Sequence, residues 1–478
     1  MEEQKKTQGM LYKKMDFENW YPEVILKAEI ADYSAVSGCI VLRPYGYAVW
    51  ENVVKHVDAK LKRMGVRNAY FPLLIPESFL KKEEEHVKGF APEVAWVTEA
   101  GESKLNERLA IRPTSETIIY PSYSKWIKSY NDLPMRLNLW NNVIRWEFKH
   151  PKLFLRGREF LWNEGHTAFA RKEDAEKEVA EILDMYYDFV KDYMALEGQK
   201  SQKTESEKFA GAVYTKTVEC MMPDGKMIQG PDAHFDGQNF AKAFDIKFID
   251  KDEEIKYVWQ NTWAISTRML GVMFAFHSDD KGLVIPPRLA PTQIVIVPIY
   301  KDKDKKKVLD EAGKIFQKLS KEFHVNFDDR EGYTPGWKYN EWEMKGIPLR
   351  IEIGPKDIEK ESVTIARRDT GEKSQIKMSE VVGTVAKELD DMQNRLYNNS
   401  KKFLEEHTKN AKNMAEFKKH IEGNRVMINW CGDAACEAKV KEETSAKSTG
   451  MPFNTEVKGE CAVCGKKAKH VVYFAKSL

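Results

Sequence analysis

Hydrophobic and polar positions alternate without a fixed repeat over the first 290 residues. Residues 45–64 and 174–196 have the 3.6-residue apolar spacing of amphipathic helices, and the first of these ends at Gly65. VRNAYFPLLIP (66–76), residues 109–111, LNLWNNVIRWEF (137–148) and EFLWNEGHTAF (159–169) are typical of strands. Because strands and helices do not form a regular βαβ repeat here, the pattern predicts an α+β fold with an antiparallel sheet.

The pattern changes near residue 290. QIVIVP (293–298) is a continuous apolar strand, and a lysine-rich helix ending near Phe323 follows it. VNFDD (325–329), a short helix near 340–345, PLRIEIG (348–354) and SVTIARR (362–368) complete an alternating α/β unit, for which a mostly parallel, buried sheet is expected. After Glu380 a long polar helix leads to a cysteine-rich tail. The predicted domains are therefore 1–290, 291–385 and 386–478.

Composition narrows the choice of protein class. A chain of 478 residues is too long for one ordinary core, and 76 Lys+Arg against 74 Asp+Glu give a net charge of +2. This balance excludes a strongly basic nucleic-acid coat, although one domain can still carry a basic face. No apolar run reaches the roughly 18 residues of a membrane span, and the charged N-terminus lacks a secretory signal. We expect a cytoplasmic protein without membrane contact.

Four of the six cysteines crowd into the tail. Cys431, Cys436, Cys461 and Cys464 follow the pattern C-x4-C-x24-C-x2-C. Two close pairs joined by a loop can deliver four thiolates to one tetrahedral zinc ion, and a site with four sulfurs is structural. The alternative is four unpaired thiols, but such thiols are normally found among apolar residues, and these lie among Gly, Asp, Glu and Lys. The pattern favours a structural Zn²⁺.

Candidate phosphate ligands are arginines, since neither a P-loop nor a G-x-G-x-x-G sequence is present. Arg145, Arg156 and Arg158 lie on a strand–loop–strand hairpin, where their planar guanidinium groups can bind phosphate oxygens. The turn at 112–116 adds hydroxyls and a carboxylate suited to an amine. Each feature alone is weak, because surface hairpins often carry arginine.

Longer segments carry a resemblance. LRPYGYAVWENV with YFPLLIP, VIRWEFKHPKLFLRGREFLWNEGHTAF, and TWAISTR are similar to the three ordered motifs of class II aminoacyl-tRNA synthetases. HSDDKGLVIPPRLAP and DDREGYTPGWKYNEWEMKGIPLRIEIGPKD extend this likeness, and nearly the whole chain resembles the prolyl-tRNA synthetases of the archaeal and eukaryotic type. The resemblance implies a class II antiparallel-sheet catalytic core, an α/β anticodon-binding domain and an α+β zinc-binding C-terminal domain. It also implies a homodimer, formed through the first motif around Pro72.

The implied activity is ATP-dependent activation of L-proline to prolyl-adenylate, followed by transfer to tRNA(Pro). Arg145 and Arg268 would act in catalysis together with Mg²⁺. The residues implied for proline are Thr114, Glu116, Arg145, Trp162, Glu164, His166 and His234. Those implied for ATP are Arg145, Glu147, Arg156, Phe160, Gln229, Ser266 and Arg268. Those implied for the anticodon are Glu343, Arg350 and Lys356.

Several positions depart from the family pattern. Asp232 stands where relatives have threonine, Ala233 where they have serine, Asp236 where they have leucine, and Ala264 and Ser278 where they have glycine. An aspartate facing ATP phosphates would repel them unless a metal intervenes. Three hypotheses remain open: an active synthetase with an altered pocket, a paralogue that binds tRNA but has altered or lost proline activation, and a zinc-containing regulatory protein without enzyme activity.

Overall fold

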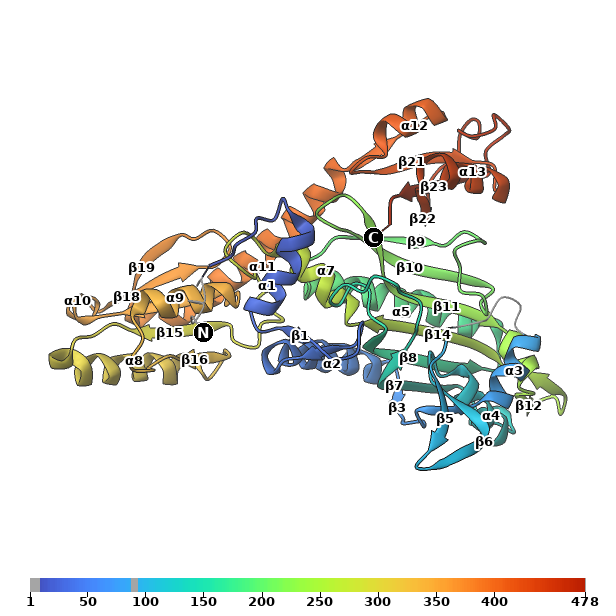
Figure 1. Ribbon diagram of the computed structural model, residues 1–478, viewed down its shortest axis with the longest axis horizontal. Helices are drawn as coiled ribbons and strands as arrows, with labels where there is room; N and C mark the ends of the chain where they lie inside the picture. The colour runs from blue at the N-terminus through green and yellow to red at the C-terminus, as the bar shows by residue number, and fades with distance from the viewer. Residues whose placement is uncertain (1–8, 87–92, 478) are drawn as a thin grey trace.

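The computed structural model describes residues 9–86 and 93–477, and one large sheet organises them (Figure 1). This sheet has eleven strands. In spatial order they are β20 (Thr408–Asn410), β21 (Arg425–Trp430), β23 (His470–Ala475), β22 (Lys447–Pro452), β9 (Gly198–Gln202), β10 (Tyr214–Met221), β11 (Met227–Gly237), β14 (Trp259–Ser266), β8 (Glu159–Phe169), β7 (Met135–Ile144) and β3 (Arg67–Asn68).

The prediction of an antiparallel core is confirmed. All neighbouring strands of the large sheet run antiparallel except the β3/β7 pair and the β20/β21 pair at its two edges. The two strands expected over 137–148 and 159–169 are β7 and β8, which pair along their whole length. Because successive side chains of a strand point to opposite faces, Trp162, Glu164 and His166 share one face of β8.

The opposite face of the sheet is covered by helices. α5 (Lys172–Asp192) packs across β10, β11 and β14, and its buried stripe includes Ile182, Tyr186 and Phe189. Tyr186 donates a hydrogen bond to Asn163 Oδ1 of β8 over 3.0 Å, which fixes the helix against the sheet. α1 (Phe17–Lys27), α2 (Pro44–Arg63) and α7 (Arg268–His277) contribute to the same core. The helices predicted over 45–64 and 174–196 are thus α2 and α5.

A smaller sheet lies beside the strand edge of the core. It pairs β4 (Leu74–Pro76) and β5 (Trp96–Ala100) with β6 (Ser103–Ile111), and β6 leads into α4 (Glu116–Trp126). Arg112 anchors this junction, because its guanidinium donates to the carbonyls of Asn142 at 2.8 Å and Phe71 at 2.9 Å. The continuous strand predicted over 66–76 is wrong: only β3 and β4 form, one in each sheet, and residues 69–73 cross between the sheets.

The α/β unit lies at the far end of the molecule from the small sheet (Figure 1). Its strands, in spatial order, are β16 (Val325–Phe327), β15 (Ile294–Pro298), β17 (Leu349–Ile353), β18 (Ser362–Arg367) and β19 (Lys373–Lys377). Its helices are α8 (Lys305–Leu319), α9 (Pro335–Met344) and α10 (Pro355–Glu359). The expected sheet was mostly parallel, but β17/β18 and β18/β19 are antiparallel. The connections, residues 354–361 with the short α10 and residues 368–372, are too short for the crossover of a dozen or more residues that parallel strands need.

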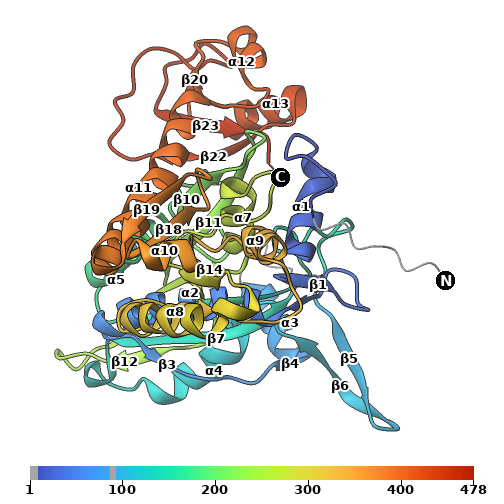
Figure 2. The ribbon, with the colours of Figure 1, turned by 90° about the vertical axis from the view of Figure 1, so that its left-hand side faces the viewer.

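The C-terminal part is tied to the catalytic sheet rather than hanging from it. α11 (Val381–Glu406) runs from the α/β unit to this part, which also holds α12 (Met414–His420) and α13 (Ala434–Thr444) (Figures 1 and 2). β22 pairs with β9 through Met451 opposite Gln202 and Pro452 opposite Ser201. The strands of the C-terminal part therefore continue the catalytic strands in one sheet. No helix among residues 9–86 and 93–477 is both long and apolar enough to cross a membrane.

The remaining elements are short. α3 (Glu77–His86) lies near the small sheet and α6 (Asn239–Ala243) follows β11, while two hairpins, β1 (Ala31–Tyr33) with β2 (Ile40–Leu42) and β12 (Lys247–Ile249) with β13 (Ile255–Tyr257), complete the described chain.

Candidate functional site

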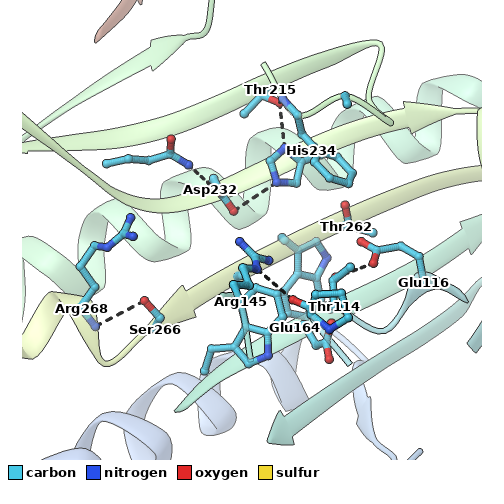
Figure 3. Close-up of a pocket in the computed structure, with 18 of the residues that line it drawn as sticks. Thr114, Glu116, Arg145, Glu164, Thr215, Asp232, His234, Thr262, Ser266 and Arg268 are labelled. Atoms are coloured by element: carbon cyan, nitrogen blue, oxygen red, sulfur yellow. Dashed lines mark hydrogen bonds and ion pairs between the residues drawn. The ribbon is translucent and has the colours of Figure 1, made fainter. Parts of the chain in front are cut away.

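A cavity of about 410 Å³ lies on the face of the large sheet that α5 leaves uncovered (Figure 3). Its floor is formed by alternate residues of β8, β11 and β14, and its ends by the start of α4 and the start of α7. Gly165 of β8 makes this floor possible, since a Cβ there would stand 2.1 Å from the Trp263 indole. All the residues implied for proline and ATP line this cavity except Arg156.

Arginines supply the positive charge of the cavity. Arg145 follows β7, and its Nε donates to the Pro113 carbonyl at 2.9 Å while its guanidinium lies 5.2 Å from the centre of the Trp162 ring. Arg268 begins α7 at the other end of the cavity, where its own amide donates to Ser266 Oγ over 3.4 Å. Burial and the nearby Arg145 lower the pKa of Arg268. Within the described residues neither guanidinium has an ion-pair partner, so both can bind an anion.

Glu116 faces these arginines across the cavity (Figure 3). It is the first residue of α4, only 3% of its surface is exposed, and its Oε2 accepts a hydrogen bond from the Thr114 hydroxyl. A carboxylate at a helix N-terminus is stabilised by the helix dipole. A buried carboxylate opposite two cations suits a zwitterion that carries an amine at one end and a carboxylate at the other.

Glu164 is held by internal partners. Its carboxylate accepts hydrogen bonds from the Ser115 amide at 3.1 Å and from the Asn141 amide group at 2.8 Å, and it lies 3.1 Å from His166 Nε2. Burial raises its pKa, but His166, Ser115 and Asn141 outweigh this, so the pKa lies below the ordinary value. Glu164 therefore positions Ser115 and His166 at the wall of the cavity.

Asp232 and His234 form a chain across β11. Asp232 Oδ2 accepts from Gln229 Nε2 at 2.6 Å, and its Oδ1 lies 3.4 Å from His234 Nε2. Thr215 Oγ1 lies 2.8 Å from His234 Nδ1. Burial raises the pKa of Asp232, but the opposing effect of His234, Gln229 and Arg145 is larger. The pKa therefore lies below the ordinary value, and this carboxyl is ionised at neutral pH. The negative charge that the sequence pattern places here is thus shared with a histidine, a glutamine and an arginine.

Asp236 lies under the cavity. It is fully buried, Thr262 Oγ1 lies 3.4 Å from its Oδ1, and its Oδ2 has no hydrogen-bond partner among the described atoms. Burial, and then the charge of Glu116, raise its pKa well above the ordinary value. Burial and the charge of Glu116 therefore favour the protonated form of Asp236.

The other departures from the family pattern differ in position. Ala264 lies on the cavity floor between Asp232 and Glu164, its partners on the neighbouring strands. Ala233 points into the core on the α5 side. Having alanine here instead of the serine of the family pattern therefore does not alter the cavity. Ser278 lies beyond α7, where its Oγ accepts from the Val284 amide over 3.3 Å. Ala233 and Ser278 therefore do not line the cavity.

Arg156 lies in the loop between β7 and β8, outside the cavity. Its guanidinium lies 5.9 Å from the Phe148 ring, and its backbone pairs with Lys152.

The three residues predicted to contact the anticodon do not all lie together. Glu343 and Arg350 line one cavity of about 190 Å³ in the α/β unit together with Lys373, whereas Lys356 lies on α10 outside it.

The cysteine cluster forms as the spacing predicts. The sulfur atoms of Cys431, Cys436, Cys461 and Cys464 all lie within 4.8 Å of one another. Four thiols at this separation fit the donor set of a tetrahedral Zn²⁺. Cys431, Cys436 and Cys461 also belong to a hydrophobic cluster with residues of β21, β23 and α13, so a bound ion would stabilise the C-terminal part.

Two residues that hold predicted site residues in place, Thr215, which lines the cavity, and Asn141, which does not, have no distinctive sequence pattern. Thr215 orients His234, and Asn141 accepts from Trp162 Nε1 at 2.7 Å. Thr215 becomes recognisable only when β10 is paired with β11, since this register places it opposite His234. The loop 207–210, which covers one side of the cavity, carries no distinctive pattern.

Comparison with known proteins agrees with this arrangement. Three family models match the chain: "tRNA synthetase class II core domain (G, H, P, S and T)" over residues 96–277, "Anticodon binding domain" over 293–388, and "Prolyl-tRNA synthetase, C-terminal" over 414–478. The last is typical of the archaeal and eukaryotic type.

Relatives match at full length. A proline–tRNA ligase of Natranaerobius thermophilus is 49% identical, covering 97% of this chain and 96% of its own. Proline–tRNA ligases of Symbiobacterium thermophilum and Clostridium novyi are 49% and 47% identical with the same coverage. The chain belongs to the prolyl-tRNA synthetases, the class II aminoacyl-tRNA synthetases that act as proline–tRNA ligases.

Proposed function

We propose that the 410 Å³ cavity binds L-proline and ATP side by side and forms prolyl-adenylate. The observation that carries this proposal is the placement of one buried carboxylate, Glu116, opposite two guanidiniums without ion-pair partners among the described residues, Arg145 and Arg268. Glu116 and Thr114 bind the imino group of proline, and Arg145 binds its carboxylate and the α-phosphate. Trp162, with His166 and His234, encloses the ring of proline.

The nucleotide occupies the part of the cavity toward α7. Arg268 binds the terminal phosphates, and Phe160 packs against the adenine. Gln229, Ser266 and Glu147 line the same part and contact the nucleotide. Arg156 completes the phosphate contacts when its loop folds over bound ATP, since catalytic contacts are often long or absent before the substrates bind.

The chemistry needs no general base in its first step. The proline carboxylate is already a nucleophile, and it attacks the α-phosphorus in line while the bond to pyrophosphate breaks. In the second step a ribose hydroxyl of the terminal adenosine of tRNA attacks the carbonyl carbon of the adenylate and AMP leaves. Catalysis therefore consists of positioning the two substrates and neutralising the charge that develops on the phosphates.

Magnesium fits this cavity. Hard carboxylate oxygens are the ligands that Mg²⁺ prefers, and Glu147 and Asp232 present such oxygens to the nucleotide part. A bound Mg²⁺ would neutralise phosphate charge that the arginines leave unmatched. It would also remove the repulsion between Asp232 and ATP.

Proline-dependent exchange of pyrophosphate into ATP tests the proposal. Arg268→Ala should lower the exchange rate about 100-fold or more, because removing one preorganised group that stabilises developing charge costs roughly 10²–10³ in rate. Arg171→Ala is the matched control, since this exposed arginine pairs only with Asp174 at 2.8 Å. Exchange by Arg268→Ala within a few-fold of the control would refute the assignment.

The other parts of the chain would serve the tRNA. We infer that residues 1–290, 291–385 and 386–478 are the catalytic, anticodon-binding and zinc-binding domains. Glu343 and Arg350 would contact the anticodon of tRNA(Pro) in their shared cavity, and Lys373 is better placed than Lys356 to join them. Zinc would be held by the four clustered cysteines. A homodimer built on the first motif, and a cytoplasmic location, remain part of the proposal.

A further inference from the structure

A second cavity of about 190 Å³ lies at the seam between the catalytic sheet and the C-terminal part. One wall comes from the loop 202–214, and the other from Trp430, Gly432 and His470, next to the cysteine cluster. This seam exists because β22 extends the catalytic sheet by pairing with β9. Neither the adenylate chemistry nor the zinc site uses this cavity.

The cavity adjoins the proposed adenylate site. Lys208 lines both cavities, so they adjoin each other at this residue. Its Nζ donates to the Ala212 carbonyl at 2.6 Å and pairs with Glu205 at 3.0 Å, which holds the loop between the cavities in place. A ligand that places one group in the first cavity can therefore place the adjoining group in the second.

Aromatic rings and cations line this second cavity. Tyr214 and Trp430 form part of the wall, and the exposed His470 ring lies 5.7 Å from the Trp430 ring. Lys469 lies at the rim, where its Cδ is 4.0 Å from the position that a Cβ on Gly432 would take. It is exposed and has no ion-pair partner within residues 9–86 and 93–477. Exposed Lys466 and Lys467 continue the positive charge along the same hairpin.

The negative groups at this cavity are largely matched. Glu205 pairs with Lys208, and the buried Lys203 pairs with Glu219 over 2.5 Å. Stacking rings with cations at the rim are the usual construction of a single-stranded nucleic-acid site. Small-molecule pockets usually measure about 300–1,000 Å³. At about 190 Å³ this cavity suits one base rather than a larger metabolite.

We propose that this cavity, lined by Lys208, Tyr214, Trp430 and His470 with Lys469 at its rim, binds a nucleotide of the single-stranded 3′ end of tRNA while the terminal adenosine enters the adenylate site. The proposal rests on the proposed function, because it requires tRNA to approach the adenylate cavity. It gives the C-terminal part a direct role in transfer: its rings hold the nucleotide before the terminal adenosine, and Lys469 contacts the adjoining phosphate.

Binding of two RNAs tests the proposal. The Lys469→Ala/His470→Ala double variant and the wild-type protein are titrated with full-length tRNA(Pro) and with the same tRNA lacking its 3′-terminal CCA. Lys419→Ala is the matched control, since this exposed lysine lies on α12 at the outer tip of the same part (Figure 1). Loss of one stacked base should weaken binding by roughly fivefold or more. We expect this loss with full-length tRNA and no difference with the truncated tRNA.

Three results would overturn the proposal. The first is equal binding of full-length tRNA by the double variant and the control. The second is an equal loss for both RNAs, which would place the contact on the body of the tRNA. The third is a loss of proline-dependent pyrophosphate exchange in the double variant, because exchange does not involve tRNA. Failure of exchange in the wild-type protein would instead refute the proposed function.

Discussion

Asp236 is the residue whose replacement should stabilise this protein. It is fully buried with one oxygen unpartnered among the described atoms, and burial and Glu116 raise its pKa well above the ordinary value. In the unfolded chain an aspartate has a pKa near 3.9. Above that pH the folded state holds a proton that the unfolded state has released, so stability falls as pH rises.

Asp236 destabilises the folded state in two ways, by its raised pKa and by its unpartnered oxygen, and two variants separate these contributions to the free energy of unfolding. Asp236→Asn keeps the shape but cannot titrate, so it should remove the pH-dependent part, which grows by about 1.4 kcal/mol for each pH unit above 3.9 until the folded pKa is reached. Asp236→Leu also removes the unpartnered oxygen, whose burial costs about 1–3 kcal/mol. Leucine is the residue that the family pattern places here, so the space should accept it.

Hydrogen exchange of the β11 and β14 amides is the suitable assay, since a chain with several domains does not unfold in one step. Opening free energies measured at pH 5 and pH 8 should show Asp236→Asn more stable than wild type, with the larger gain at pH 8. Asp232→Asn is the control, for which the expected change in stability has the opposite sign, because the pKa of Asp232 lies below the ordinary value. It should lose stability at neutral pH, and the loss should shrink as pH falls below 4. Equal gains for Asp236→Asn at both pH values would refute the reasoning.

Three further predictions concern other parts of the chain. Removing zinc with a chelator, or Cys461→Ser, should expose the C-terminal amides to exchange, because structural zinc sites contribute about 10–16 kcal/mol of apparent binding free energy; unchanged protection would argue against a metal. Burial lowers the pKa of His277 to about 4, although its Nε2 donates to the Met194 carbonyl at 2.9 Å. Stability should therefore fall as pH drops from 6.5 toward 4, by at most about 3.4 kcal/mol, and hydrogen exchange of the α7 amides in His277→Asn should lack this slope. Arg350→Ala should raise KM for tRNA about 5- to 150-fold without changing pyrophosphate exchange, the range expected for loss of one base contact; an unchanged KM would exclude it from the anticodon site.

Most of the fold could be predicted from local patterns. The apolar stripe of α5 and the alternation in β8 identify the helix, the strand and the face that each buries. The sheet of the α/β unit was expected to be mostly parallel because apolar runs alone do not reveal whether a turn or a crossover joins two strands. The pairing of β22 with β9 joins residues about 250 positions apart, and no periodicity encodes such a contact.

In the candidate site too, local sequence motifs predict some residues, whereas others depend on contacts between distant parts of the chain. The arginines and Glu116 were found because long ordered motifs contain them, whereas Thr215 was missed because only strand register brings it to His234. The sequence pattern singles out Asp236 as a departure from the family. Its burial and its raised pKa required the structure, because the sequence cannot distinguish a residue that lines a cavity from one that does not.

The carboxyls around the cavity decide whether the departures from the family pattern abolish proline binding. The carboxylate of Glu164 already has hydrogen-bond partners in Ser115, Asn141 and His166. The carboxylate of Asp232 contacts Gln229 and His234, and burial raises the pKa of Asp236 well above the ordinary value. Glu116, by contrast, accepts a hydrogen bond only from Thr114 among the described side chains.

One carboxylate with spare acceptor capacity therefore still faces two guanidiniums that have no ion-pair partner in the described part of the chain, and this is the charge pattern that a proline zwitterion beside a nucleotide needs. The two additional aspartates do not compete for the imino group, because Asp232 already contacts Gln229 and His234, and Asp236 does not line the cavity and has a raised pKa. This arrangement favours an active synthetase with an altered pocket over a paralogue that has lost amino-acid activation.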